Sequence, residues 1–176
     1  VTYSSIEPTS EYRVVAELNM ASESALRASG NDYPPDIPEQ YLEVPLSLPN
    51  RISTLSRDIT LNTTNNYDRS AALETFLRTL QYTTVSNIIP HDADTIDHFL
   101  FQSREGYSDY FASSMAIMLR TLGIPTRLVL GFGPGLPKPE EDGFIIRDLD
   151  SHSWPEVYFP NIGWIPFEPT PIYPLR

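Results

Sequence analysis

The chain has 176 residues, of which 40% are hydrophobic and 20% are charged, a composition typical of a globular domain rather than a disordered segment. Its formal net charge of -11 argues against a nucleic-acid partner, because binding to a phosphate backbone requires a basic face. The absence of cysteine excludes disulfides and thiolate metal sites, and the sequence has no run of about 18 apolar residues that would predict a membrane span.

The sequence predicts an N-terminal accessory segment, residues 1–50, packed on a main domain, residues 51–176. Alternation over 11–20 predicts a strand, and 21–28 is a short helix candidate. Residues 31–50 are rich in proline but include aromatic residues, which usually pack against something. We therefore expect this stretch to be an ordered wrap around the core.

Four helices are expected in the first part of the main domain. Apolar spacing predicts helices over 51–60 and 68–80, the second with Asp68 as its N-cap. A short helix is expected over 93–101. A longer amphipathic helix is expected over 108–122, where glycine and proline follow as helix-stop signals.

Short strand candidates dominate the rest of the chain: 127–132, 144–148, 154–159 and 164–167. Between the first two lies a glycine- and proline-rich acidic stretch, 133–143, which we interpret as a flexible loop able to overhang a cleft. Helices followed by a run of strands indicate an α+β fold with an antiparallel sheet.

Three separated side chains could form one catalytic unit. Ser108 follows a glycine turn at a helix start, where unpaired N–H groups and the helix dipole stabilise negative charge. His152 is the best candidate for a general base, and Glu168 could orient its ring. Taken singly, each residue has a simpler structural interpretation; for the serine, this is an ordinary N-cap.

The order and spacing of these segments resemble bacterial transglutaminase-like domains, which share the architecture of papain-like thiol proteases. The resemblance covers about 67–170 and rests on four motifs in order: Arg-Glu-Gly-Tyr-Ser-Asp-Tyr-Phe-Ala at 104–112, Leu-Arg-Thr-Leu-Gly-Ile-Pro-Thr-Arg at 119–127, His-Ser-Trp-Pro-Glu-Val at 152–157, and Gly-Trp-Ile-Pro-Phe-Glu-Pro-Thr at 163–170. It implies a central helix, carrying the nucleophile position, packed on an antiparallel sheet.

Carried over position by position, the resemblance places Ser108 on the family's catalytic cysteine, His152 on its histidine and Glu168 on its acid. Asp150 and Glu156 are rivals for the acid. The implied activity is cleavage or transfer at a peptide amide or a glutamine carboxamide, with a protein or peptide substrate and no cofactor. A serine hydroxyl is far less acidic than a thiol, so we expect this serine form to be weakly active or inactive.

Further residues could complete the cleft. Gln102 is a candidate donor to the oxyanion, beside the backbone N–H of Ser108. Tyr107 flanks the nucleophile position and could shape its pocket, and Trp154 could line the acyl-donor cleft. The three histidines lack ligand spacing, so no metal site is expected.

Other interpretations remain open at this stage. The serine could be native, or it could replace a cysteine. The domain could be a non-catalytic extracellular module that uses the same cleft to hold a peptide or a cell-wall strand, or a purely structural domain with no open cleft. By resemblance, we expect an extracytoplasmic domain of a membrane protein, in contact with the membrane only through other parts of the parent protein.

Overall fold

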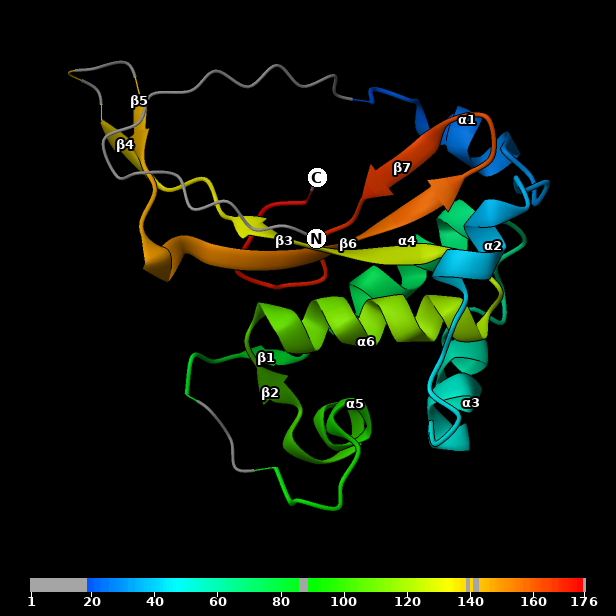
Figure 1. The fold of residues 1–176 in the computed structure, drawn as a ribbon, viewed down its shortest axis with the longest axis horizontal. Helices are drawn as coiled ribbons and strands as arrows, with labels where there is room; N and C mark the ends of the chain where they lie inside the picture. The colour runs from blue at the N-terminus through cyan, green and yellow to red at the C-terminus, as the bar shows by residue number, and fades with distance from the viewer. Residues whose placement is uncertain (1–18, 86–88, 139, 141–142, 176) are drawn as a thin grey trace.

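The computed structural model describes residues 19–85, 89–138, 140 and 143–175. The predicted strand over 11–20 lies almost entirely outside these residues. In the described part, a central helix packs against one face of a three-stranded antiparallel sheet with strand order β3–β6–β7 (Figure 1). This arrangement confirms the predicted α+β class.

The helices lie in the first two thirds of the chain. They are α1 (Glu23–Ala28), α2 (Asp36–Tyr41), α3 (Asn50–Ile59), α4 (Asn66–Leu77), α5 (Thr95–His98), a π-helix (Phe99–Ser103) and α6 (Ser108–Thr121). The strands are β1 (Gln81–Tyr82), β2 (Glu105–Gly106), β3 (Thr126–Phe132), β4 (Leu136–Lys138), β5 (Gly143–Ile145), β6 (Ser151–Phe159) and β7 (Gly163–Pro166). A short 3-10 helix (Asp148–Asp150) precedes β6.

The start of α4 corrects one prediction. Asn65, not Asp68, is the N-cap: its side-chain oxygen accepts a hydrogen bond from Asp68 N at 2.9 Å. Asp68 lies inside the first turn, where a carboxylate is favoured by the helix dipole. Both residue types suit the cap, so the extended backbone of Asn65 decides between them.

Two stretches expected to lack regular structure contain some. The wrap over 31–50 includes the short helix α2, and the loop over 133–143 includes β4, which pairs with β5 as an antiparallel hairpin. The strand expected over 144–148 is shorter than predicted, since β5 ends at Ile145. Pairing between strands is non-local, so a glycine- and proline-rich composition does not reveal it.

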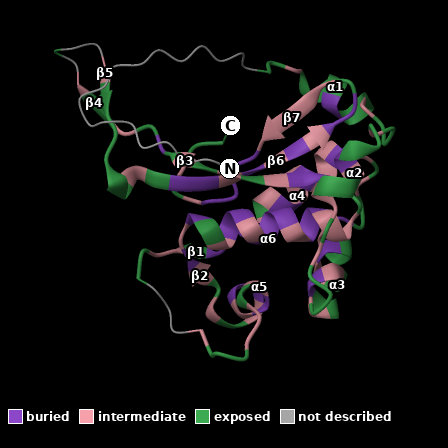
Figure 2. Ribbon diagram, in the orientation of Figure 1, coloured by how far each residue is buried: buried purple, intermediate pink, exposed green. Residues whose placement is uncertain are grey.

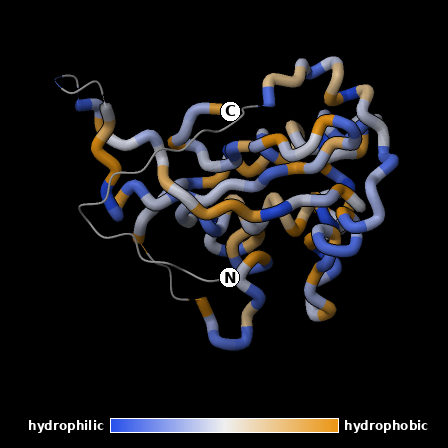
Figure 3. Tube along the Cα trace, turned by 45° about the horizontal axis from the view of Figure 1, so that its top comes forward, coloured by the Kyte–Doolittle hydropathy of each residue, from blue (hydrophilic) through white to orange (hydrophobic). Residues whose placement is uncertain are grey.

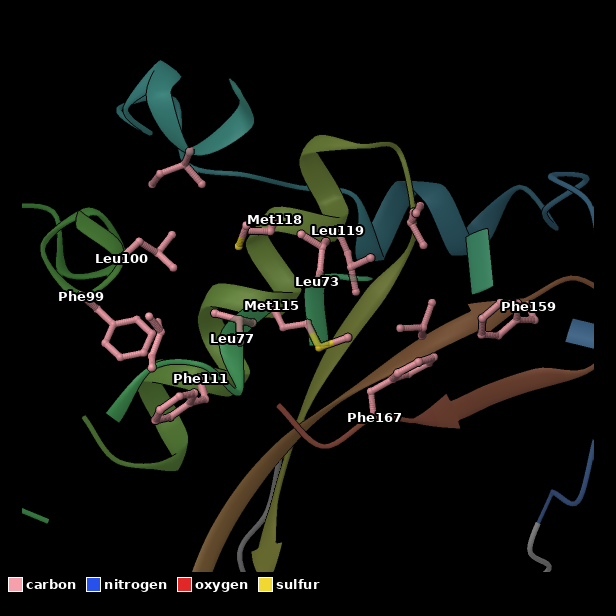
Figure 4. Close-up of a cluster of buried hydrophobic side chains, with 14 of the residues drawn as sticks. Leu73, Leu77, Phe99, Leu100, Phe111, Met115, Met118, Leu119, Phe159 and Phe167 are labelled. Carbon is pink, nitrogen blue, oxygen red and sulfur yellow. The ribbon is translucent and has the colours of Figure 1, made fainter. Parts of the chain in front are cut away.

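The hydrophobic core lies between α4, α6 and the sheet. Figure 4 shows leucines of α4 and methionines of α6 packed together, with phenylalanines from β6 and the segment after β7 alongside. The side chains of Leu73, Met115, Met118 and Phe159 are fully buried. Burial coloured on the ribbon shows that most of α6 is inaccessible to solvent, as expected for a helix at the centre of the domain (Figure 2).

The described part of the N-terminal segment packs on this core. Leu26 of α1 belongs to the core cluster, and Tyr41 of α2 makes an edge-to-face contact with Trp164 of β7, with ring centroids 4.7 Å apart. The division at residue 50 stays a prediction. Hydrophobic and hydrophilic residues alternate throughout the coloured part of the trace in Figure 3. Among the described residues, no helix is long and apolar enough to cross a bilayer.

Candidate active site

Ser108 is the first residue of α6, which corrects its interpretation as an N-cap. Tyr107 occupies the cap position, with extended backbone and no side-chain hydrogen bond to the helix. The preceding turn requires glycine, because a Cβ at Gly106 would lie 2.8 Å from the ring of Tyr110. Ser108 is 7% exposed, and as the first helical residue its N–H has no partner within the helix, whereas Tyr110 N in the same turn donates to the cap carbonyl of Tyr107 at 3.0 Å. This environment suits a developing negative charge.

His152 lies at the start of β6, at the same end of the domain as the start of α6 (Figure 1). Its Nε2 donates a hydrogen bond to Glu168 Oε2 at 2.8 Å, and both side chains are buried. No described residue forms a hydrogen bond with Nδ1 of the same ring. With the proton on Nε2, Nδ1 carries a lone pair and can accept a proton.

Ser108 and His152 both line one cavity of about 440 Å³. It opens between the start of α6 and the edge of the sheet, and its wall is made by Tyr82, Thr84, Tyr107, Ser108, Asp109, Leu130, Gly131, Leu149, Ser151 and His152. The presence of an open cavity beside Ser108 removes the main support for a purely structural domain.

A hydrogen bond between the residues that follow Ser108 and His152 connects α6 to β6. Ser153 Oγ donates to Asp109 Oδ1 at 2.7 Å, and each of these residues directly follows one member of the pair. The bond joins the first turn of α6 to β6. Ser108 and His152 are therefore presented to the cavity by two elements in a fixed relation, although no hydrogen bond links them directly.

Glu168 is fully buried and is held through its backbone as well as its side chain. Its N–H donates to Glu74 Oε1 at 2.6 Å, and its carbonyl accepts a hydrogen bond from Arg78 Nη1 at 2.7 Å. Its Oε1 accepts from Thr170 N at 3.2 Å. Burial raises the pKa of Glu74, although the hydrogen bond from Glu168 N opposes this shift.

The two rival acids are engaged elsewhere. Asp150 pairs with Arg147 at 2.8 Å, and this hydrogen-bonded contact lowers the pKa of the Asp150 carboxyl. Glu156 pairs with Arg127 at 2.6 Å. The structure therefore selects Glu168 as the carboxylate that contacts the imidazole.

Of the three remaining predicted cleft residues, one lines the cavity and two do not. Tyr107 lines the cavity. Gln102 is exposed on the π-helix and is not part of the cavity wall, so the structure does not bring it to the site. Trp154 lies beside the cavity rather than in its wall: its ring is nearly parallel to that of His152, with centroids 5.9 Å apart, and a Cβ at Gly131 would approach it to 2.9 Å.

Sequence reasoning missed Tyr173, which stacks on His152 with ring centroids 3.8 Å apart and an interplanar angle of 22°. It also missed Tyr82 and Thr84 in the cavity wall. No local pattern marks these residues, because β1 and the C-terminal segment reach the site only through the tertiary fold. Among the described residues, no group of three or more His, Asp or Glu side chains could hold a metal ion.

Comparison with known proteins identifies the family to which this sequence is similar. A family model described as the transglutaminase-like superfamily matches residues 53–169. The protein YebA of Bacillus subtilis is 37% identical over 163 residues, which are 89% of this chain and 22% of that protein. A protein-glutamine gamma-glutamyltransferase of Pseudomonas aeruginosa is 38% identical over 78 residues, which are 44% of this chain and 12% of that protein.

Solved structures agree with these sequence matches. The periplasmic domain of TgpA from Pseudomonas aeruginosa superposes with a TM-score of 0.71 at 28% identity, over 79% of this chain and 48% of that chain. The chain thus spans about a fifth or less of the length of these two sequence relatives and about half of the structural relative.

Proposed function

Because this chain belongs to the transglutaminase-like superfamily, we propose that its cavity is an acyl-transfer site of the thiol-triad kind. Ser108 occupies the nucleophile position, His152 is the general base and Glu168 orients the base. The observation that carries this proposal is the hydrogen bonding of the two ring nitrogens of His152. Nε2 is bonded to a buried carboxylate, while Nδ1, beside Ser108 in the cavity wall, has no partner in the part of the chain that the structure describes.

The residues support a two-stage reaction. The side chain at 108 attacks the carbonyl carbon of a peptide amide or glutamine side chain, and its proton passes to His152 Nδ1. The first-turn N–H groups of α6 stabilise the oxyanion. When the C–N bond breaks, the leaving amine or ammonia takes the proton from Nδ1, and an acyl-enzyme remains.

The second stage releases the acyl group. Water or an acceptor amine attacks the acyl carbon and gives its proton to Nδ1. The bond between the acyl carbon and residue 108 then breaks, and residue 108 takes the proton back. Glu168 keeps the Nε2 proton in its hydrogen bond throughout and stabilises the imidazolium.

The serine sets the level of activity. A cysteine reacts as its thiolate, which an adjacent imidazolium and a helix N-terminus favour, whereas a serine must lose its proton during the attack. In the proposed site, the cleft and the base His152 are present, but Ser108 is a poor nucleophile. The chain as it stands is weakly active or inactive.

The relatives support a proposed location and substrate class. A structural relative is named as a periplasmic domain, and a sequence relative is named as a protein-glutamine gamma-glutamyltransferase. We place this domain outside the cytoplasmic membrane, acting on glutamine-containing or other peptide acyl donors. The acceptor, water or an amine, is left open by the cavity.

Alkylation of Ser108→Cys by iodoacetamide tests the site. A free thiol is roughly 3% thiolate at pH 7, so complete ionisation raises the alkylation rate by up to roughly 30-fold. We expect the alkylation rate of Ser108→Cys to approach this roughly 30-fold increase over a free thiol. Adding His152→Ala to Ser108→Cys should return the rate to that of a free thiol. Ser108→Cys with His152 intact should also release ammonia from a glutamine peptide.

Ser151→Cys is the matched control, because Ser151 lines the same cavity but does not begin a helix. Its thiol should react at the ordinary rate. Ordinary reactivity at position 108 as well would refute the proposed nucleophile position. Fast alkylation at 108 with no turnover of any amide or amine would instead favour a peptide-binding module that retains the cleft, the alternative supported by the serine itself.

A further inference from the structure

Tyr173 makes the closest aromatic contact with the imidazole, and none of the predicted roles accounts for it. Its ring stacks on His152 at 3.8 Å with the planes 22° apart. We propose that Tyr173 is a positioning residue for His152: its ring face fixes the imidazole plane and stabilises the imidazolium formed when Nδ1 accepts a proton. This inference rests on the proposed function.

The contacts around the ring leave it little freedom. Glu168 holds Nε2, Tyr173 covers one ring face, and the ring of Trp154 lies nearly parallel at 5.9 Å. Rotation of the imidazole about its Cβ–Cγ bond would break the stack and the hydrogen bond together. The unpartnered Nδ1 is therefore held in one direction.

The segment that carries Tyr173 also carries Glu168, and one guanidinium holds both. Arg78 donates to the carbonyl oxygens of residues 168 and 170 from Nη1, at 2.7 and 3.0 Å, and to those of residues 171 and 173 from Nη2, at 3.2 and 2.9 Å. On the other side, Gly133 makes room for the tyrosine, since a Cβ there would lie 2.9 Å from its ring. The carboxylate and the aromatic partner of His152 are thus placed as one unit.

The chemistry of Tyr173 points to its ring face rather than its hydroxyl. Burial raises the pKa of the Tyr173 phenol, and the neighbouring Tyr82, Glu168 and Asp150 raise it further. The phenol therefore stays neutral at pH 7 and neither donates nor removes a proton as an acid or base. An aromatic face against an imidazolium is instead a cation–π contact, which stabilises the charged form.

The test uses the complete chain with Ser108→Cys and compares Tyr173→Leu with Tyr173→Phe. We expect Tyr173→Leu to slow alkylation by iodoacetamide at pH 7 by roughly 10-fold, the scale of a desolvated cation–π contact. Tyr173→Phe retains the ring face and should stay within about 2-fold of the parent. Alkylation of Ser151→Cys should not respond to either change.

Thermal unfolding of each variant is measured in parallel. If Tyr173→Leu does not unfold cooperatively, Tyr173→Met takes its place, since it also fills the site without a ring. An unchanged rate in the folded variant without a ring would overturn the inference, as would an equal loss in Tyr173→Phe, which would assign the effect to the hydroxyl. A parent cysteine form with ordinary reactivity would overturn the proposed function first, so the two failures are distinguishable.

Discussion

At the scale of the residue, His152 is defined by what surrounds it. One ring nitrogen bonds a buried carboxylate, one ring face lies on an aromatic ring, and the other nitrogen has no hydrogen-bond partner within residues 19–85, 89–138, 140 and 143–175. A buried polar atom without a hydrogen bond costs stability. The lack of a partner for Nδ1 among the described residues is therefore destabilising, and the proposed role as a proton acceptor accounts for it.

Replacing the Glu168 carboxylate by an amide separates its orienting hydrogen bond to His152 from its stabilisation of the imidazolium charge. In the Ser108→Cys background, the amide oxygen of Glu168→Gln can still accept a hydrogen bond from Nε2–H, but the neutral amide lacks the charge that stabilises the imidazolium. Hydrogen bonds to charged groups contribute about 1.5–3 kcal/mol, so we expect alkylation at pH 7 to slow by at least roughly 10-fold. Glu156→Gln, which removes the carboxylate paired with Arg127, should leave the rate unchanged. Equal rates in both variants would contradict the role of Glu168.

At the scale of the element, an ion pair anchors the segment leading to the nucleophile turn. Arg51 of α3 donates to both carboxylate oxygens of Asp97 in α5, and its guanidinium also lies over the ring of Phe101, 4.4 Å from the centroid. The π-helix and β2 follow α5 and lead directly to Ser108. The pair therefore fixes the chain that enters the site from below α6 in Figure 1.

This ion pair predicts a pH dependence of stability. The hydrogen bond from Arg51, aided by its charge, lowers the pKa of Asp97. The unfolded chain, with a value of about 3.9, therefore binds more protons in the window below that value, and stability falls as pH falls. The stabilisation is fully present above about pH 4 and is lost as pH drops through the lower, folded value.

Asp97→Asn should accordingly lower the free energy of unfolding at pH 7, and its difference from the parent should shrink as pH falls below the ordinary aspartate value toward the lowered folded pKa. Urea titrations across this range provide the measurement. Asp92→Asn is the control, because Asp92 is exposed and lies in the turn before α5. A stability difference that does not change with pH would show that the bidentate pair is not what Asp97 contributes.

At the scale of the whole molecule, the described part of the N-terminal segment, residues 19–50, contributes to the core. Leu26 is 5% exposed within the core cluster, and Asn66 of α4 donates to Tyr33 Oη at 2.7 Å. Tyr33 in turn contacts the ring of Tyr158 in β6, with centroids 6.3 Å apart. Residues expected to be accessory thus cover both α4 and the sheet.

A chain that begins at residue 50 should therefore be less stable than the complete chain. Leu26→Ala alone should cost about 2–5 kcal/mol of unfolding free energy, the range for a buried leucine. The matched control is Leu46→Ala, because Leu46 is fully exposed and its truncation should change stability by less than about 0.5 kcal/mol. Equal melting temperatures for the short and complete chains would show that the domain boundary lies at residue 50.

The sequence by itself determined the class of fold and the positions of the candidate triad. Helix periodicity, the glycine turn before Ser108 and the order of four motifs are local patterns, and local patterns survive in a single sequence. The family comparison confirms the fold that they implied. The catalytic roles stay predictions, although the cavity places Ser108 and His152 side by side.

Only the tertiary structure decided which groups surround the imidazole. The resemblance had already placed Glu168 at the acid position, and the structure adds that its carboxylate bonds His152 while the rivals Asp150 and Glu156 bond arginines. Tyr173 reaches the imidazole, and Arg78 holds it, only through the tertiary packing of the C-terminal segment. The predicted donor Gln102 proved to be exposed and away from the cavity. The reason is physical: periodicity reports which face of an element is buried, whereas the partner of a buried polar group depends on distances between elements far apart in the chain.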